Sequence, residues 1–290
     1  MLRLLKSFFF RLKHDLTFRI TAFIGLGLSI IIPLVYFSLD LGSYLINLSG
    51  NPDPEPFKAT FCTGQALFVG SLSPVQNFGI AIPINLVSFI VLEFNHGTVR
   101  NKIVSGHSKL AVYLSLVISA IILSLLFIVG YTALSTGFGS LFGLGGFDMN
   151  GLAGLSGVMN LEYFIKVTIL TILIYITIAA MVTFFAGMFR NIGPSIAVVI
   201  LIILGVYLSG TLVGTISGLF PDQEVIKFIT TMFKILNPMY GLSNTGTDIL
   251  TGGKLTIDNL TFISGIITNL LCTAAFVGFG ALIFTKTDVK

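Results

Sequence analysis

The stretch that follows Lys166 reads VTILTILIYITIAAMVTFFAGMF over residues 167–189, and Arg190 ends it. A helix rises about 1.5 Å per residue, so a segment of this length crosses the ~30 Å hydrocarbon core of a bilayer. A charge at the centre of such a helix costs about 2.5–3.5 kcal/mol on insertion scales, and here the charges stand at the two ends. The segment therefore predicts a membrane-spanning α-helix.

The same pattern recurs along the chain. Six windows are long, apolar and free of Asp, Glu, Lys and Arg, at 20–39, 66–92, 110–131, 167–189, 192–217 and 259–285. The whole chain is 54% hydrophobic and only 10% charged, whereas a soluble domain carries about 25% charged residues to keep its surface solvated. We therefore expect an all-α, polytopic membrane protein with six transmembrane helices over residues 17–290.

Basic residues are divided unevenly between the two sides that six spans create. The side that holds both termini carries eleven of the 16 Lys and Arg residues and only three of the 12 acidic residues. Basic residues are in excess on the cytoplasmic side of membrane proteins. Both termini are therefore expected in the cytoplasm, in a cell membrane and most simply a bacterial plasma membrane. The basic pI of about 9.1 then reflects topology, and no nucleic-acid partner is expected.

Residues 1–16 have the pattern of an amphipathic helix. One face carries Leu2, Leu5, Phe8, Phe9, Leu12 and Leu16, and the other carries Arg3, Lys6, Arg11, Lys13 and His14. Such a helix lies in the headgroup layer with its basic face toward anionic lipid. We expect Arg3, Lys6, Arg11 and Lys13 to contact the membrane surface, although a generic cytoplasmic flank remains the alternative.

The outer segment 218–258 contains a short amphipathic stretch, EVIKFITTMFKIL at 224–236, which is too short to span. It is predicted to be re-entrant or to lie on the membrane surface, because irregular backbone at membrane depth must be buried in protein or line a cavity.

The predicted spans contain no ionisable acid or base, which argues against an ion-coupled carrier. A path without fixed charge suits a hydrophobic or amphipathic cargo. The polar side chains expected to face a path or a partner helix, or else to pack, are Asn85, Tyr175, Thr177 and Thr183. The two cysteines, Cys62 and Cys272, have neither a metal-site nor a disulfide-framework spacing, and we expect packing roles.

The inner loop 93–109 reads EFNHGTVRNKIVSGHSK and is longer than a turn requires. Thr98 is a plausible N-cap, with Gly97 permitting the turn, for a short helix near 98–105 that lies across the cytoplasmic end. The alternative to a functional role for this loop is that its basic residues only enforce the membrane topology.

The loop resembles the first cytoplasmic loop of the type-2 export permeases of ATP-binding-cassette transporters. The matching positions are Glu93, Gly97, Thr98, Arg100, Asn101, Lys102 and Gly106. In that family the loop forms a coupling helix seated on the nucleotide-binding subunit. The six spans, the cytoplasmic termini, the interfacial helix and the outer element are also similar to the family. The resemblance implies two partners, a cytosolic ATP-binding-cassette ATPase subunit and a second permease copy or homologue, besides membrane lipid.

No phosphate-binding loop of the form G-x-x-x-x-G-K-[ST] occurs, since Gly252-Gly253-Lys254 lacks the earlier glycine and Leu255 follows it. We therefore expect a transport subunit that is not an enzyme and holds no cofactor, with ATP and Mg²⁺ bound by the partner. The leading hypothesis is an export permease. A motor-independent secondary carrier or channel and a non-transporting sensor or immunity subunit remain alternatives.

Overall fold

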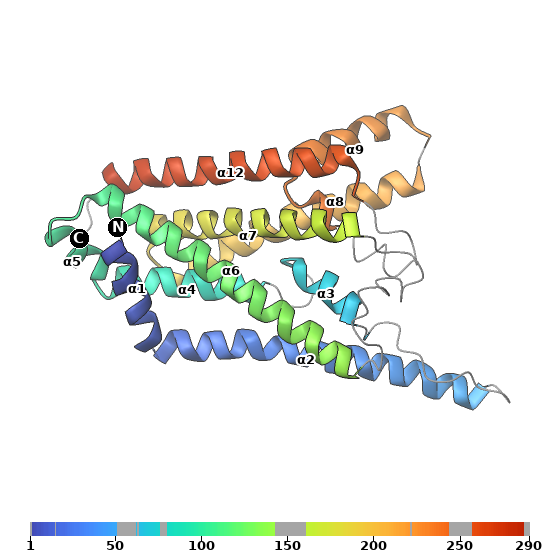
Figure 1. Cartoon of the computed structure of the whole chain (residues 1–290). Helices are drawn as coiled ribbons and strands as arrows, with labels where there is room; N and C mark the ends of the chain where they lie inside the picture. Colours follow the sequence, from blue (N-terminus) through green and yellow to red (C-terminus); the bar gives the residue numbers. More distant parts are fainter. Residues whose placement is uncertain are drawn as a thin grey trace.

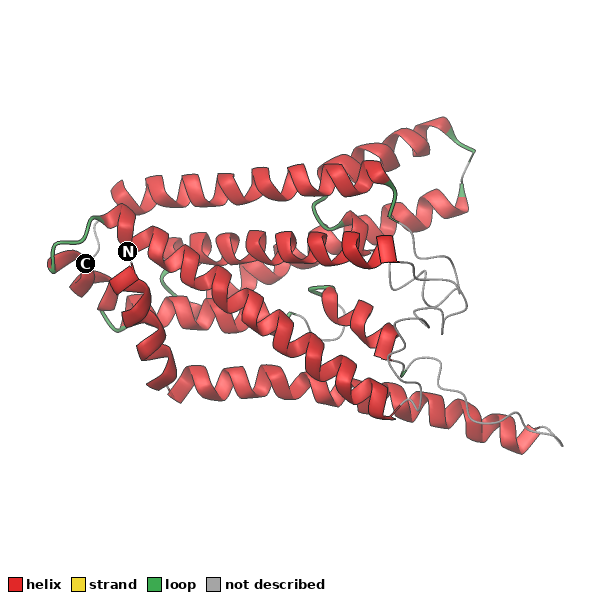
Figure 2. Cartoon of the chain, in the orientation of Figure 1, coloured by secondary structure: helices red, strands yellow, loops and turns green. Residues whose placement is uncertain are grey.

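The computed structural model describes residues 2–14, 16–50, 62, 64–75, 80–142, 161–220, 222–243 and 257–286, and every regular element among them is a helix (Figure 2). Residues 244–256 of the predicted outer segment and the side chain of Arg3 lie outside the described part. The helices, labelled in Figure 1, are α1 (Leu2–His14), α2 (Leu16–Gly50), α3 (Gly64–Leu72), α4 (Ala81–Asn95), α5 (Thr98–Val104), α6 (Lys109–Phe142), α7 (Leu161–Phe189), α8 (Ile192–Leu219), α9 (Glu224–Leu236), α10 (Tyr240–Ser243) and α12 (Asn259–Lys286).

Five of the described helices are long and apolar enough to cross a membrane, namely α2, α6, α7, α8 and α12. Each contains one of the predicted windows, so the chain is an all-helical membrane protein. Helix α6, with 34 residues, is about 51 Å long, and in Figure 1 it crosses the bundle obliquely. The extra length beyond ~20 residues accommodates this tilt.

The window at 66–92 was expected to be a single helix, but it forms two. Helix α3 ends at Leu72, Ser73 and Pro74 are no longer helical, and α4 begins at Ala81. Proline has no N–H to donate, and it disfavours helical geometry in the residue before it. Pro83 is tolerated because it lies in the first turn of α4, where N–H groups have no intrahelical acceptor.

Helix α7 is the centre of the bundle. Its spanning window is 67% buried, against 11% for α12 and 22% for α2. Figure 1 shows α2 and α12 on opposite sides, with α7 and α4 between them. Small side chains on α7, such as Ala179 and Ala186, are fully buried, and small residues of this kind let neighbouring helices approach closely.

The two ends of the bundle differ in what they contain. At one end lie α1, α5, the start of α6 and the end of α12, and the Lys109 ammonium donates to the Thr285 carbonyl at 3.2 Å. We call this the α5 end. At the opposite end, the α9 end, α9 runs beside α8 and α12.

Candidate functional site

Two glycines in left-handed conformations bracket α5. Gly97 has φ of 67° and Gly106 has φ of 93°, a region that side chains with a Cβ rarely adopt. The prediction that Gly97 permits the turn is confirmed, and the predicted helix near 98–105 is found at Thr98–Val104. Together with a 52° bend between α4 and α5, these turns set α5 across the end of the bundle.

The predicted N-cap role of Thr98 is wrong by one position, because Gly97 is the N-cap and Thr98 is the first helical residue. The Thr98 hydroxyl lies 2.7 Å from the main-chain oxygen of Glu93 and 2.8 Å from its Oε2. It donates to these acceptors of the preceding helix, so its oxygen does not cap the N–H groups of α5. The residue therefore ties α5 back to α4.

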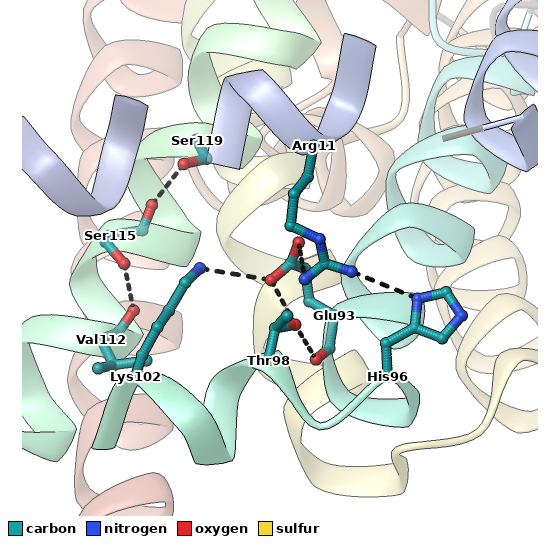
Figure 3. A network of polar contacts seen from close by, with 8 residues as sticks. All are labelled: Arg11, Glu93, His96, Thr98, Lys102, Val112, Ser115 and Ser119. Carbon is teal, nitrogen blue, oxygen red and sulfur yellow. Dashed lines mark hydrogen bonds and ion pairs between the residues drawn. The ribbon is translucent and has the colours of Figure 1, made fainter. Parts of the chain in front are cut away.

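Glu93, in the last turn of α4, is the centre of the site (Figure 3). Glu93 is only 2% exposed, and a buried carboxylate is stable only when it is paired and hydrogen-bonded. The Lys102 ammonium lies 3.3 Å from Oε2, and Arg11 Nη1 lies 3.3 Å from Oε1 as an ion pair without hydrogen-bond geometry. Two cations and the Thr98 hydroxyl thus surround one carboxylate.

Arg11 places α1 in the same cluster, which differs from the sequence analysis. Arg11 was expected to contact the membrane surface, whereas its guanidinium faces Glu93 and also contacts His96 Nδ1 at 3.4 Å. The reason is Phe8, one turn earlier, which is buried against Phe89 with ring centroids 4.5 Å apart. An anchored Phe8 turns this face of α1 toward α4.

Lys102 links the same two helices from the other side. Its ammonium lies 5.9 Å from the centre of the Phe8 ring, in cation–π geometry. Lys6 and Lys13, by contrast, are exposed. Their contact with the membrane surface stays a prediction.

The residues of α5 therefore fall into two groups. Val99 and Lys102 face the bundle, whereas Arg100, Asn101 and Val104 face away from it. We call these last three the exposed face of α5. Val104 is 78% exposed, and such an apolar side chain between polar neighbours suits the centre of a small protein–protein contact.

No family model matches the chain, and neither a curated protein nor a solved structure matches it. The family resemblance accordingly rests on the loop residues themselves. In the part of the chain that the structure describes, no group of three or more His, Cys, Asp and Glu side chains is placed to hold a metal ion.

The polar residues predicted inside the spans serve mainly as packing groups. Asn85 donates to the Ala81 carbonyl of its own helix, and Thr183 to that of Ala179. Tyr175 is fully buried. Among these four described side chains, Thr177 is the one that bonds to another helix, since its hydroxyl lies 3.0 Å from Asn269 Oδ1 and 3.0 Å from Thr273 Oγ1 on α12.

Asn269 is a functional candidate that the sequence analysis missed. Its amide nitrogen donates to the carbonyl oxygens of Pro238, at 3.1 Å, and Gly265, at 2.8 Å. Because Asn269 lies ten residues into α12, the turn that follows α9 reaches about 15 Å along that helix. An asparagine in the middle of an apolar window was the available signal, since such residues commonly bond across membrane helices.

The turn after α9 is held by a second amide. Asn237 donates to the Val206 carbonyl of α8 at 2.8 Å, and its Oδ1 accepts from the Met239 N–H at 2.8 Å. Asn237 and Asn269 together satisfy backbone groups where the helix has ended. We call this arrangement the α9 turn.

An ion pair also lies at the α9 end, where Lys234 Nζ is 3.3 Å from Asp258 Oδ2. Burial alone would raise the pKa of Asp258, but the nearby Thr261 hydroxyl and Lys234 ammonium outweigh it and hold that pKa below its usual value. Cys62 is fully buried, and its N–H donates to Asp40. This agrees with the packing role expected for Cys62.

Proposed function

We propose that the chain is the membrane-spanning permease subunit of an ATP-driven exporter, which works with a separate cytosolic ATPase subunit of the ATP-binding-cassette class. The observation that carries this proposal is α5. It is a short helix between two left-handed glycines, fastened from behind by a buried Glu93 and presenting Arg100, Asn101 and Val104 outward. A helix held in this way transmits a displacement to the helices behind it.

The path of such a displacement follows the contacts of the site. Displacement of α5 acts on Glu93 through Lys102 and Thr98. Because Glu93 belongs to α4, the displacement is passed to that helix. Helix α4 packs on α7 and α8, and α6 starts three residues after Gly106. Movement of the partner subunit would thus tilt α4 and α6 together. Helix α1 shares the carboxylate through Arg11 and would move with them.

In this proposal the membrane is crossed six times, and the α5 end is cytoplasmic. Helices α3 and α4 form the second span together. Their 9 and 15 residues amount to about 36 Å of helix, enough for a broken span. Lys6 and Lys13 of α1 lie in the headgroup layer, and the α9 turn is re-entrant. Its amide bonds supply what non-helical backbone needs at membrane depth.

The cargo class follows from the chemistry of the spans. Their window residues carry no charge, which suits a hydrophobic or amphipathic cargo, such as a peptide, a lipid-like compound or a drug. A second permease copy or homologue would complete the path. The proposed location is a bacterial plasma membrane.

The test is a charge placed on the exposed face of α5. Val104→Asp should leave the fold intact, because the side chain is exposed, and should abolish cargo-stimulated ATP hydrolysis of the complex purified from its native membrane. The matched control is Asn95→Asp, which adds the same charge at an exposed position of the same end, outside α5. Equal stimulation in both variants would contradict the proposal. Transport that persists after ATP depletion and follows an ion gradient would instead support a motor-independent carrier.

A further inference from the structure

A groove in the half of the bundle toward the α9 end is not used by the proposed coupling. It lies between α3, α6 and α7 and has a volume of about 570 Å³. None of its lining residues is charged, and most are apolar, including Phe68, Leu72, Val129 and Ile172. The groove therefore offers no partner for an ionic ligand.

The shape and the opening of the groove restrict its occupant further. The rings of Phe68 and Phe164 stack in its wall with centroids 5.1 Å apart. Val129 and Ile172 line it while remaining 68% and 41% exposed. The groove therefore opens sideways, on the apolar surface of two membrane-length helices. An occupant enters it from the bilayer and not from water.

The volume distinguishes a lipid chain from a protein helix. It corresponds to roughly 20 groups of the ~30 Å³ that a water molecule takes in the liquid, a size close to that of a methylene group. A helix is 10–12 Å wide with its side chains, so only about one turn of a partner helix would fit. A single long acyl chain fills the same space along its length.

We propose that this groove binds one acyl chain of a membrane phospholipid. The hydroxyl-bearing residues Thr132, Thr136 and Ser140 recur every fourth residue along the α6 wall. The Thr136 hydroxyl is itself buried, so the groove holds the chain through its apolar wall and not through a hydrogen bond to the ester. The lipid site does not depend on transport or on a partner subunit.

Gly137 provides the variant that fills the groove. It lines the groove, and a Cβ added to it meets no atom within 4 Å, so Gly137→Leu extends into the free space without displacing protein. Gly278 of α12 is the matched control, because a Cβ there also meets no atom within 4 Å and the residue lies outside the groove. Gly278→Leu makes the same chemical change elsewhere on the exposed surface.

The experiment uses the full chain in nanodiscs of phosphatidylglycerol with a trace of phosphatidylcholine that carries a diazirine on a sixteen-carbon acyl chain. After irradiation, mass spectrometry should find adducts concentrated on Phe68, Val129 and Ile172, above those on the lipid-exposed Leu208 and Leu271. Gly137→Leu should lower the groove adducts about tenfold, since a filled groove disfavours the bound chain. Gly278→Leu should leave them unchanged.

Two outcomes would overturn the proposal. One is labelling of the groove no stronger than that of Leu208 and Leu271, and the other is groove labelling that Gly137→Leu leaves intact. Should Gly137→Leu fail to fold, Ala133→Leu enlarges another exposed side chain of the same α6 wall. That variant must then lower the groove adducts, and unchanged labelling counts against the site.

Discussion

The α5 end and the α9 turn solve the same problem with different chemistry. Both fix a short segment that joins two helices against the rest of the bundle. At the α5 end this is done by a buried carboxylate with a lysine and an arginine. At the α9 turn it is done by the neutral amides of Asn237 and Asn269.

In the proposed topology, the difference follows from depth in the membrane. Arg11 retains one third of its side-chain exposure, so the charged cluster remains in reach of water and headgroups. The α9 turn reaches about 15 Å along α12, where a charge would be expensive. Amides satisfy backbone groups there without an ionic desolvation cost. In the proposed exporter, the charged end receives the movement and the neutral turn is a fixed point.

The largest effect is expected from Glu93→Ala, which leaves Arg11 and Lys102 without their shared carboxylate. Removing one partner of a buried ion pair costs about 3–5 kcal/mol, and the partial exposure of Arg11 reduces this to roughly 2–4 kcal/mol. Hydrogen exchange of residues 98–104 should accelerate and the unfolding temperature should fall. Unchanged exchange in α5 would show that the cluster does not hold the helix. Glu93→Gln, which keeps the shape and an acceptor for Thr98, should lose less.

The second effect tests the α9 turn. Asn269→Leu removes the bonds to Pro238, Gly265 and Thr177 and leaves buried carbonyls unsatisfied, which costs about 1–3 kcal/mol. Proteolysis or hydrogen exchange should report opening of residues 237–243.

Asn85→Leu is the control for this prediction, because Asn85 is also buried but donates to the Ala81 carbonyl of its own helix. If both variants destabilise α9 equally, the turn is not held by Asn269.

The third effect concerns the turn before α5. Gly97→Ala meets no atom within 4 Å, so its cost is conformational, about 1–2 kcal/mol for a Cβ in the left-handed region. Gly205→Ala, inside α8 and equally free of contacts, should be neutral or stabilising. The unfolding temperature should therefore fall for Gly97→Ala and stay the same or rise for Gly205→Ala. Equal shifts in the two variants would contradict the left-handed turn.

The smallest effect is a pH dependence at the α9 end. The folded-state pKa of Asp258 is lowered, so its stabilising contribution is complete above the unfolded-state pKa of about 3.8 and is lost as pH falls through the folded value. Hydrogen exchange at the start of α12 should accelerate below about pH 3.8. Asp258→Asn should remove that dependence. A transition of the same size in the variant would assign it to another group.

Local pattern predicted most of the helices and not their joints. Five windows, α5 and α9 were predicted because each depends on residues adjacent in sequence. The break between α3 and α4 was not predicted, because a proline in an apolar window, here Pro74, permits either a kink in one helix or the end of it. The bond from Asn269 to Pro238 joins residues 31 positions apart, and no local pattern contains it. Arg11 was misplaced because helical projection does not show which neighbour will bury Phe8.

The most direct test of the central claim is a photo-crosslinking amino acid at Val104 in intact native membranes, followed by mass spectrometry of the adduct. The account predicts a soluble subunit that contains a phosphate-binding loop, captured from Val104 and not from the same crosslinker at Asn95. Capture of no such subunit from Val104, with the chain purified alone from the same membranes, would contradict the docking role of α5.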